Sequence, residues 1–336
     1  VIYVSLDDIY FTENRLIYFA EEFNRHGGKY LFMDEVHKYR NWSQEIKNIY
    51  DSLPDLQVIF TSSSALDIYR GSHDLSRRAN IYHLPGLSFR EYIEIRYGIK
   101  LPVLTLEEIL REHIVKAGEI KTLIKPLQYF AEFLEKGYYP YFLESNNSYK
   151  KRLINTVNSA IESDLPPIFQ IDFKSVIKIK KMLAVIANIV PYKPNIQKLA
   201  QQSETTRDSL LKFLFYLDKA NILKWLGKDY YGINYLNKPE KLYLHNTNLM
   251  YALSNQVPDA GNLRETFFLN QLSAVHQVTY PVQGDFLADN KWLFEVGGPN
   301  KQIGRLANNQ NTFLAIDGID QGFGKRIPLW LFGFLY

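Results

Sequence analysis

The sequence predicts an α/β fold that begins with a parallel β-sheet and continues through helical segments into a second α/β region. Residues 1–90 alternate short apolar runs with helical patterns. Continuous runs of Val, Ile, Leu and Phe joined by crossover helices are typical of a parallel sheet covered on both faces. The helix after the second run is expected to begin at Asn41 and to stop at Pro54. The three apolar runs read VIYVSL, KYLFMDEV and LQVIFTSSS.

Length and composition narrow the class of protein. The 336 residues include 39 basic and 36 acidic side chains, and the formal net charge of +3 does not by itself require a nucleic-acid partner. Cysteine is absent, which excludes disulfides, cysteine-ligated zinc and thiol nucleophiles. No apolar stretch reaches the roughly 18 residues of a membrane-spanning helix, and the start has no signal-peptide pattern. We therefore expect a cytoplasmic protein with no membrane partner.

Two adjacent carboxylates, Asp34 and Glu35, follow the apolar run Tyr30–Met33. This is the pattern of a Walker B strand. In such a strand the aspartate holds the Mg²⁺ bound to the nucleotide phosphates, directly or through water, and the adjacent glutamate orients and polarises the attacking water. An acidic pair at a strand exit also arises by chance, so a purely structural role is the alternative.

The next apolar run ends in hydroxyl groups, where a sensor residue beside the γ-phosphate is expected. Ser62 and Ser63 are the candidates, and capping of loose backbone groups is their structural alternative. Arg77 and Arg78 follow shortly afterwards. A guanidinium group there would stabilise charge on the transferring phosphoryl group, in trans if the protein forms a homo-oligomer. The alternative is an arginine pair on the surface.

Residues 93–168 are expected to be helical, and 172–245 follow the order helix, short helix, longer helix and hairpin, which is typical of a winged helix. Arg207 and Lys212 on the longer helix and Lys228 in the hairpin are candidate DNA contacts. The acidic side chains of Asp208 and Asp218 oppose phosphate contact. Two functions are left open for this region, DNA binding and a scaffold that packs the domains together.

The last part, 246–336, is expected to hold a helix followed by strands. Asp285 and Glu295 lie on neighbouring strands of an expected hairpin, with Glu265 on the preceding helix. This set resembles the PD-(D/E)xK nucleases, in which acidic groups gather magnesium and a lysine assists the attacking water. The motif places its lysine two residues after the last acid, where this chain has Gly297. Lys301 is the nearest replacement, and the segment GGPN would have to fold it back.

The stretch from Leu31 to Tyr92 resembles the AAA+ ATPases of bacteria and archaea that end in a nuclease-like domain of unknown function. The resemblance implies a P-loop NTPase-like (AAA+) core at 1–92, a helical lid at 93–168, a winged helix at 172–245 and a terminal α/β nuclease-like domain at 246–336. It also implies ATP and Mg²⁺ as cofactors. Its functional positions are matched by Asp34 for magnesium, Glu35 for water activation, Ser62 or Ser63 for the sensor, and Arg77 or Arg78 for an arginine finger.

One motif of that family does not occur in these 336 residues. The phosphate-binding loop G-x-x-x-x-G-K-[ST] has no match, and the segment GGKY at 27–30 is no substitute. The chain also begins without methionine, within an expected strand. We therefore expect a fragment that binds ATP weakly or not at all, whereas the intact protein hydrolyses ATP.

Two functions compete at this point. The first is an ATP-driven regulator or remodeller, in which turnover moves the lid and the winged helix relative to the terminal domain. The second is a metal-dependent nuclease or a nucleic-acid-binding protein that uses the ATPase-like part only as a scaffold. Gly297 in place of a lysine favours the first.

Overall fold

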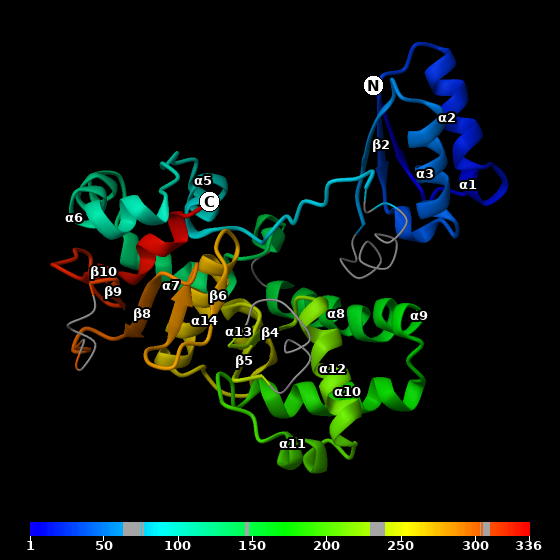
Figure 1. Cartoon of the computed structure of the whole chain (residues 1–336). Helices are drawn as coiled ribbons and strands as arrows, with labels where there is room; N and C mark the ends of the chain where they lie inside the picture. Colours follow the sequence, from blue (N-terminus) through cyan, green and yellow to red (C-terminus); the bar gives the residue numbers. More distant parts are fainter. Residues whose placement is uncertain (63–74, 76, 145–147, 229–238, 303, 305–309) are drawn as a thin grey trace. The chain divides into compact units, whose positions relative to one another are not determined.

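The computed structural model describes residues 1–62, 75, 77–144, 148–228, 239–302, 304 and 310–336 (Figure 1). Ser63 therefore lies outside the described residues. Two compact units make up the chain: 1–84 together with 163–171, and 85–162 together with 172–336. The finer division into four parts stays a prediction.

The first unit contains a parallel sheet of three strands, as its apolar runs predict. Strands β1 (Ile2–Ser5), β2 (Tyr30–Asp34) and β3 (Gln57–Phe60) are paired in that order, and both pairings are parallel. The register places Ser5 opposite Asp34 and Met33 opposite Phe60. All three strands consequently end at the same edge of the sheet.

Helices α2 (Leu16–Arg25) and α3 (Trp42–Ser52) pack against each other and lie on one side of the sheet (Figure 1). Leu31 and Met33 on β2 are buried in the core beneath them, whereas Phe32 between them is 37% exposed. The expectation of a sheet covered on both faces is therefore wrong for the described part of this unit. The exposed face carries Tyr3, Tyr30, Phe32 and Ile59.

A buried carboxylate fixes the start of α2. Glu45 on α3 accepts a hydrogen bond from the backbone N–H of Ile17 (3.0 Å) and one from Nε of Arg15 (3.2 Å). The hydroxyl of Tyr39 donates to the same carboxylate at 3.2 Å. A negative charge at a helix N-terminus satisfies unpaired N–H groups and complements the helix dipole. Glu45 thus joins α3 to α2.

The second unit begins with helices that share a core with the end of the chain. Phe89 on α5 contacts Phe130 on α7 and Phe334 in the 3₁₀ segment η7, and Phe130 contacts Phe267 on α14. Among the described residues, no helix is both long and apolar enough to cross a membrane. The helices and 3₁₀ segment of this part are α5 (Phe89–Tyr97), α6 (Leu106–Leu123), α7 (Pro126–Lys136), α8 (Tyr149–Ser159), α13 (Thr247–Leu253), α14 (Ala260–Ser273) and η7 (Leu329–Phe334).

Three helices and a strand pair follow one another in the middle of this unit. Helix α11 contacts both α10, which precedes it in the chain, and α12, which follows it. Helix α12 packs on β4. The antiparallel strands β4 and β5 pair, and Tyr192 forms an isolated bridge to Leu242 on β5. The elements are α10 (Phe173–Ala187), α11 (Ile196–Gln202), α12 (Arg207–Lys219), β4 (Leu223–Leu226) and β5 (Lys241–Leu244).

The terminal sheet has five strands in the order β10-β9-β8-β7-β6. The pairs among β6, β7 and β8 are antiparallel, whereas β8, β9 and β10 are parallel. Helix α14 packs on β8, and side chains on both faces of β8 and β9 are buried. The strands are β6 (Val278–Thr279), β7 (Phe286–Ala288), β8 (Trp292–Gly297), β9 (Thr312–Ile316) and β10 (Arg326–Pro328).

The end of the chain differs from its prediction. The run IPLWLFGFLY reads as a strand, but only its first residues belong to β10, and Leu329–Phe334 form a 3₁₀ segment. A short apolar run that is buried on every side has no periodicity that separates strand from helix. Gly333 permits the close packing of this segment, because a Cβ there would lie 2.5 Å from Cβ of Phe89.

Candidate functional site

Asp34 lies at the exit of β2, and hydroxyl groups from both neighbouring strands reach it. The hydroxyl of Tyr3 on β1 donates to Oδ2 at 2.6 Å. The hydroxyl of Thr61, directly after β3, donates to Oδ1. These hydrogen bonds, first that of Thr61 and then that of Tyr3, lower the pKa of Asp34 below its ordinary value. Asp34 is therefore a carboxylate at neutral pH.

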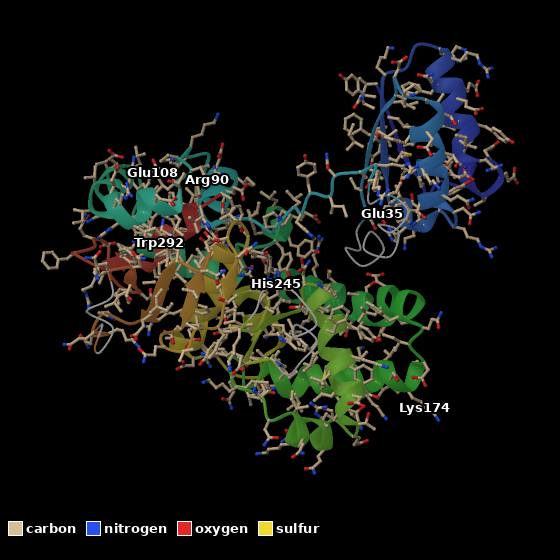
Figure 2. The ribbon with its side chains drawn as sticks, viewed as in Figure 1. Glu35, Arg90, Glu108, Lys174, His245 and Trp292 are labelled. Atoms are coloured by element: carbon tan, nitrogen blue, oxygen red, sulfur yellow. The ribbon has the colours of Figure 1, made fainter. Side chains whose placement is uncertain are left out.

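The next residue, Glu35, has a left-handed backbone with a φ of 54° (labelled in Figure 2). This conformation costs a residue with a Cβ about 1–2 kcal/mol, and such strain is concentrated at functional sites. Two backbone hydrogen bonds hold the turn: Val36 N–H to the Thr61 carbonyl (3.1 Å) and Lys38 N–H to the Glu35 carbonyl (2.9 Å). The strand therefore ends abruptly, and Asp34 and Glu35 point to different partners.

Glu35 and Ser62 both contact His37, which lies in the 3₁₀ turn after β2. His37 Nε2 is 3.5 Å from Glu35 Oε2, and its Nδ1 is 3.1 Å from Ser62 Oγ. The sequence predicts Ser62 as a sensor residue beside the γ-phosphate. In the structure Ser62 contacts His37, and the hydroxyl that reaches Asp34 is that of Thr61, one position earlier. Sequence reasoning missed Tyr3, Thr61 and His37 as members of this site. Of these three, only Thr61 had a signal in the sequence, because it belongs to the hydroxyl-rich end of the apolar run that forms β3.

The two candidate arginines have different surroundings. Arg78 forms a two-point ion pair with Asp51 on α3, with distances of 2.8 and 3.1 Å. This pair raises the pKa of Arg78 and lowers that of Asp51. Arg77 is exposed and has no hydrogen bond or ion pair to any residue that the structure describes. Arg77 is therefore the better placed of the two to reach a group outside this chain.

In the terminal sheet, Lys301 is folded back as the sequence would require. Its Nζ lies 3.1 Å from Glu295 Oε2, and a Cβ at Gly297 would lie 2.6 Å from the Cβ of Lys301. Lys301 thus occupies the space that a side chain at position 297 would need. Asp285, just before β7, accepts a hydrogen bond from the Val296 N–H at 2.9 Å. The structure therefore brings Asp285, Glu295 and Lys301 to one end of the β7–β8 pair.

Glu265 takes other partners. Its carboxylate accepts hydrogen bonds from Lys241 Nζ and from the Tyr243 hydroxyl, the latter at 2.9 Å. Burial, followed by the charge of Glu265 and then that of Asp285, raises the pKa of Tyr243. Within the described ranges, no group of three or more His, Cys, Asp and Glu side chains is arranged to hold a metal ion. The structure thus does not gather Asp285, Glu295 and Glu265 around one ion.

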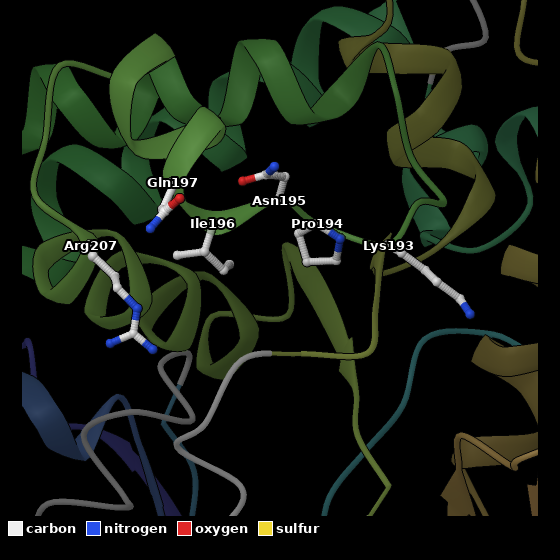
Figure 3. A pocket seen from close by; sticks show the side chains of 6 residues that line it. All are labelled: Lys193, Pro194, Asn195, Ile196, Gln197 and Arg207. Atoms are coloured by element: carbon white, nitrogen blue, oxygen red, sulfur yellow. The ribbon is translucent and has the colours of Figure 1, made fainter.

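The candidate DNA contacts lie on the surface of the middle region. Arg207 begins α12, with Nη1 3.7 Å from Asp208 Oδ1, and Lys212 is exposed. Lys228 forms an ion pair with Glu240 at 3.3 Å. A pocket of about 390 Å³ next to α11 has Lys193 and Arg207 at opposite ends of its lining (Figure 3). The remaining lining residues are Pro194, Asn195, Ile196 and Gln197.

Comparisons with known proteins agree with part of this description. Residues 1–93 match the family model of an AAA domain, and residues 127–260 match a domain of unknown function (DUF8612). An uncharacterized protein of Methanocaldococcus jannaschii is 26% identical over 234 residues, which cover 66% of this chain and 49% of that protein. The chain thus spans about half the length of this relative. No solved structure matches the chain. The N-terminal part of the chain carries an AAA-like, ATPase-like domain.

Proposed function

We propose that residues 1–92 supply the magnesium-binding and water-activating half of an ATP-hydrolysing AAA+ site. The observation that carries this proposal is Asp34, ionised at the strand exit and held by Tyr3 and Thr61. Each carboxylate oxygen has a second lone pair, so both can still accept a hydrogen bond from water on Mg²⁺. Bound Mg²⁺ would neutralise charge on the phosphates. Glu35, one residue further, orients the attacking water.

The phosphate-binding loop must come from outside residues 1–336 under this proposal, because no G-x-x-x-x-G-K-[ST] sequence occurs within them. The loop supplies backbone N–H groups and a lysine that hold the phosphates. The intact gene product is therefore expected to bind Mg-ATP. The 336-residue chain alone is expected to bind it weakly or not at all.

The test is Glu35→Gln in the intact protein. Glutamine keeps the size of the side chain but is no base, so ATP turnover is expected to disappear while Mg-ATP binding persists. Glu22→Gln, an exposed change on α2, is the matched control and should leave turnover unchanged. Unchanged turnover in Glu35→Gln would remove Glu35 from this role. No ATP binding by the intact protein would overturn the proposal as a whole.

A second candidate function is metal-dependent cleavage of nucleic acid by the terminal domain at 246–336. One observation favours it: Lys301 fills the space above Gly297 and pairs with Glu295, and Asp285 lies just before the adjacent strand β7. Lys301 would then take the position of the missing motif lysine. The function predicts Mg²⁺- or Mn²⁺-dependent cleavage that is lost in Asp285→Ala and Glu295→Ala and kept in the exposed control Asp320→Ala. An absence of cleavage with several DNA and RNA forms would count against it.

We also propose DNA as a partner of a winged helix at 172–245. The exposed Arg207 and Lys212 lie on the first half of α12, and Arg207 also lines the pocket that contains Lys193. A phosphate contact would make binding depend on salt. Arg207→Ala with Lys212→Ala is therefore expected to weaken DNA binding and to reduce its salt dependence. Binding that stays unchanged would favour a scaffold role.

Homo-oligomerisation is part of the same proposal. Arg77 is exposed without a partner among the described residues, as a finger that acts on a neighbouring subunit would require. Arg77→Ala is expected to lower turnover of the intact protein without weakening Mg-ATP binding. Arg78→Ala serves as the comparison, because its guanidinium is held by Asp51.

A further inference from the structure

Three side chains at the exits of β2 and β3 form a continuous series of contacts. Glu35 Oε2 is 3.5 Å from His37 Nε2, and His37 Nδ1 is 3.1 Å from Ser62 Oγ. The His37 side chain is only 9% exposed, whereas that of Glu35 is 28% exposed. The imidazole therefore lies inside the turn and connects the acidic side chain of one strand exit to a hydroxyl of the next.

Both ring nitrogens of His37 are engaged by this arrangement. A neutral imidazole has one donor and one acceptor nitrogen, so it can donate to a carboxylate while it accepts from a hydroxyl. The backbone hydrogen bond from Val36 N–H to the Thr61 carbonyl fixes the turn that carries the ring against the end of β3. Thus the ring position is set by the backbone and by contacts at both of its ends.

We propose that His37 is a positioning residue that holds the Glu35 carboxylate in a single orientation and joins it to Ser62. The proposal rests on the ATPase function proposed above. A carboxylate at a strained strand exit has several rotamers available, and a base that is displaced by about 1 Å can lose about 100-fold in rate. The contact with His37 favours the one orientation of Glu35 in which the carboxylate lies 3.5 Å from the ring. His37 acts through the position of the Glu35 carboxylate and takes no proton in the reaction.

The first experiment compares two substitutions of His37 in the intact protein. His37→Leu has a similar size but no hydrogen-bonding atoms, and it is expected to lower kcat by about 10–100-fold while KM for Mg-ATP stays within about twofold. His37→Gln offers an amide donor and a carbonyl acceptor and is expected to recover most of the loss. His26→Leu, an exposed change in the same unit, is the control.

A double substitution separates positioning from a structural role. If His37 acts through Glu35, then His37→Leu should add little further loss of kcat in a Glu35→Asp background, in which a shorter carboxylate keeps part of the turnover. Ser62→Ala removes the other end of the contact and is expected to lower kcat less than His37→Leu. Equal losses for His37→Leu and His37→Gln, a large change in KM, or no loss at all would overturn the proposal.

A spectroscopic readout on the 336-residue chain does not depend on turnover. Long-range ¹H–¹⁵N spectra of the His37 ring should show a shift of Nε2 in Glu35→Gln and of Nδ1 in Ser62→Ala. Ring nitrogens that respond to neither change would contradict the contact, whatever the activity. If the wild-type intact protein does not hydrolyse ATP, the proposed function fails, and the spectra still decide whether His37 holds Glu35.

Discussion

The two sheets of the protein are built differently. In the N-terminal sheet, helices cover one face, and Phe32 and Tyr3 on the other face are 37% and 65% exposed. In the terminal sheet, Phe294 on β8 is fully buried and contacts Phe268 on α14, Phe313 on β9 and Phe332 in η7. A parallel sheet ordinarily buries both faces. The described part of the N-terminal unit is therefore the thinner structure, although it holds the candidate nucleotide site.

The candidate site for hydrolysis and the largest aromatic core therefore lie in different units of the protein. The candidate hydrolysis site depends on side chains at strand exits, which need only a few ordered turns and one covered face. The terminal region with its shared aromatic core provides more buried apolar area, and buried area is the main favourable contribution to folding. We therefore expect the N-terminal unit to have the lower free energy of unfolding and to unfold at a lower denaturant concentration than the second unit.

The largest expected effect comes from removal of a core ring. Phe294→Ala should lower the free energy of unfolding of the second unit by about 3–5 kcal/mol, because it leaves a cavity between α14 and η7. Phe32→Ala on the exposed face of β2 is the matched change and should cost less than about 1 kcal/mol. Chemical denaturation followed by hydrogen exchange in each unit measures both. Similar costs would show that the face of β2 is covered in solution.

Acid should weaken the second unit through His245. Burial lowers the pKa of His245 to about 3 from an ordinary value of 6.5, so the folded state holds the neutral ring. The unfolded chain binds a proton below pH 6.5, so this stabilisation is complete above that pH and is lost as pH falls toward 3. The expected slope is about 1.4 kcal/mol per pH unit.

His245→Gln should flatten this acid limb, and His83→Gln in the exposed segment before α5 should leave it unchanged. Thermal unfolding between pH 7 and pH 4 provides the measurement. A limb that stays in His245→Gln would assign the acid sensitivity to another group.

A smaller loss is expected in the N-terminal unit from Glu45→Gln. The buried carboxylate holds the start of α2 through Ile17 and Arg15. Hydrogen bonds to a charged group are stronger than those to a neutral group. We expect a cost of about 1–2 kcal/mol, seen as faster hydrogen exchange in the first turn of α2. Glu22→Gln on the exposed side of α2 should leave exchange there unchanged.

The smallest expected effect is a change in the pKa of Asp34. The hydrogen bond from Thr61 lowers the pKa of Asp34 more than the one from Tyr3 does. Thr61→Val should therefore raise this pKa toward the ordinary value, and Tyr3→Phe should raise it less. A lowered folded pKa stabilises the fold above the ordinary pKa of Asp and loses this effect as pH falls through the folded value. Carboxyl ¹³C titration of the 336-residue chain measures the shift. Tyr30→Phe, on the exposed face of β2, is the control.

Local sequence patterns determined much of the architecture. Apolar runs located the three parallel strands, and Asn41 and Pro54 bracket helix α3 (Trp42–Ser52). The apolar run before Asp34 and Glu35 placed both carboxylates at a strand exit, and α6 begins with a capping box from Thr105 and Glu108. These features follow from side-chain periodicity and from hydrogen bonds within a few residues.

The tertiary structure alone decided which side chains meet. The pairing of β1, β2 and β3 brings Tyr3 and Thr61 to Asp34, and the strained turn at Glu35 brings His37 to Ser62. Likewise, Lys301 reaches Glu295 only because Gly297 leaves space above β8. Strand register, turn conformation and close approach depend on contacts between residues far apart in sequence, which no local pattern encodes. For that physical reason the residue types of this site could be read from the sequence, but not their partners.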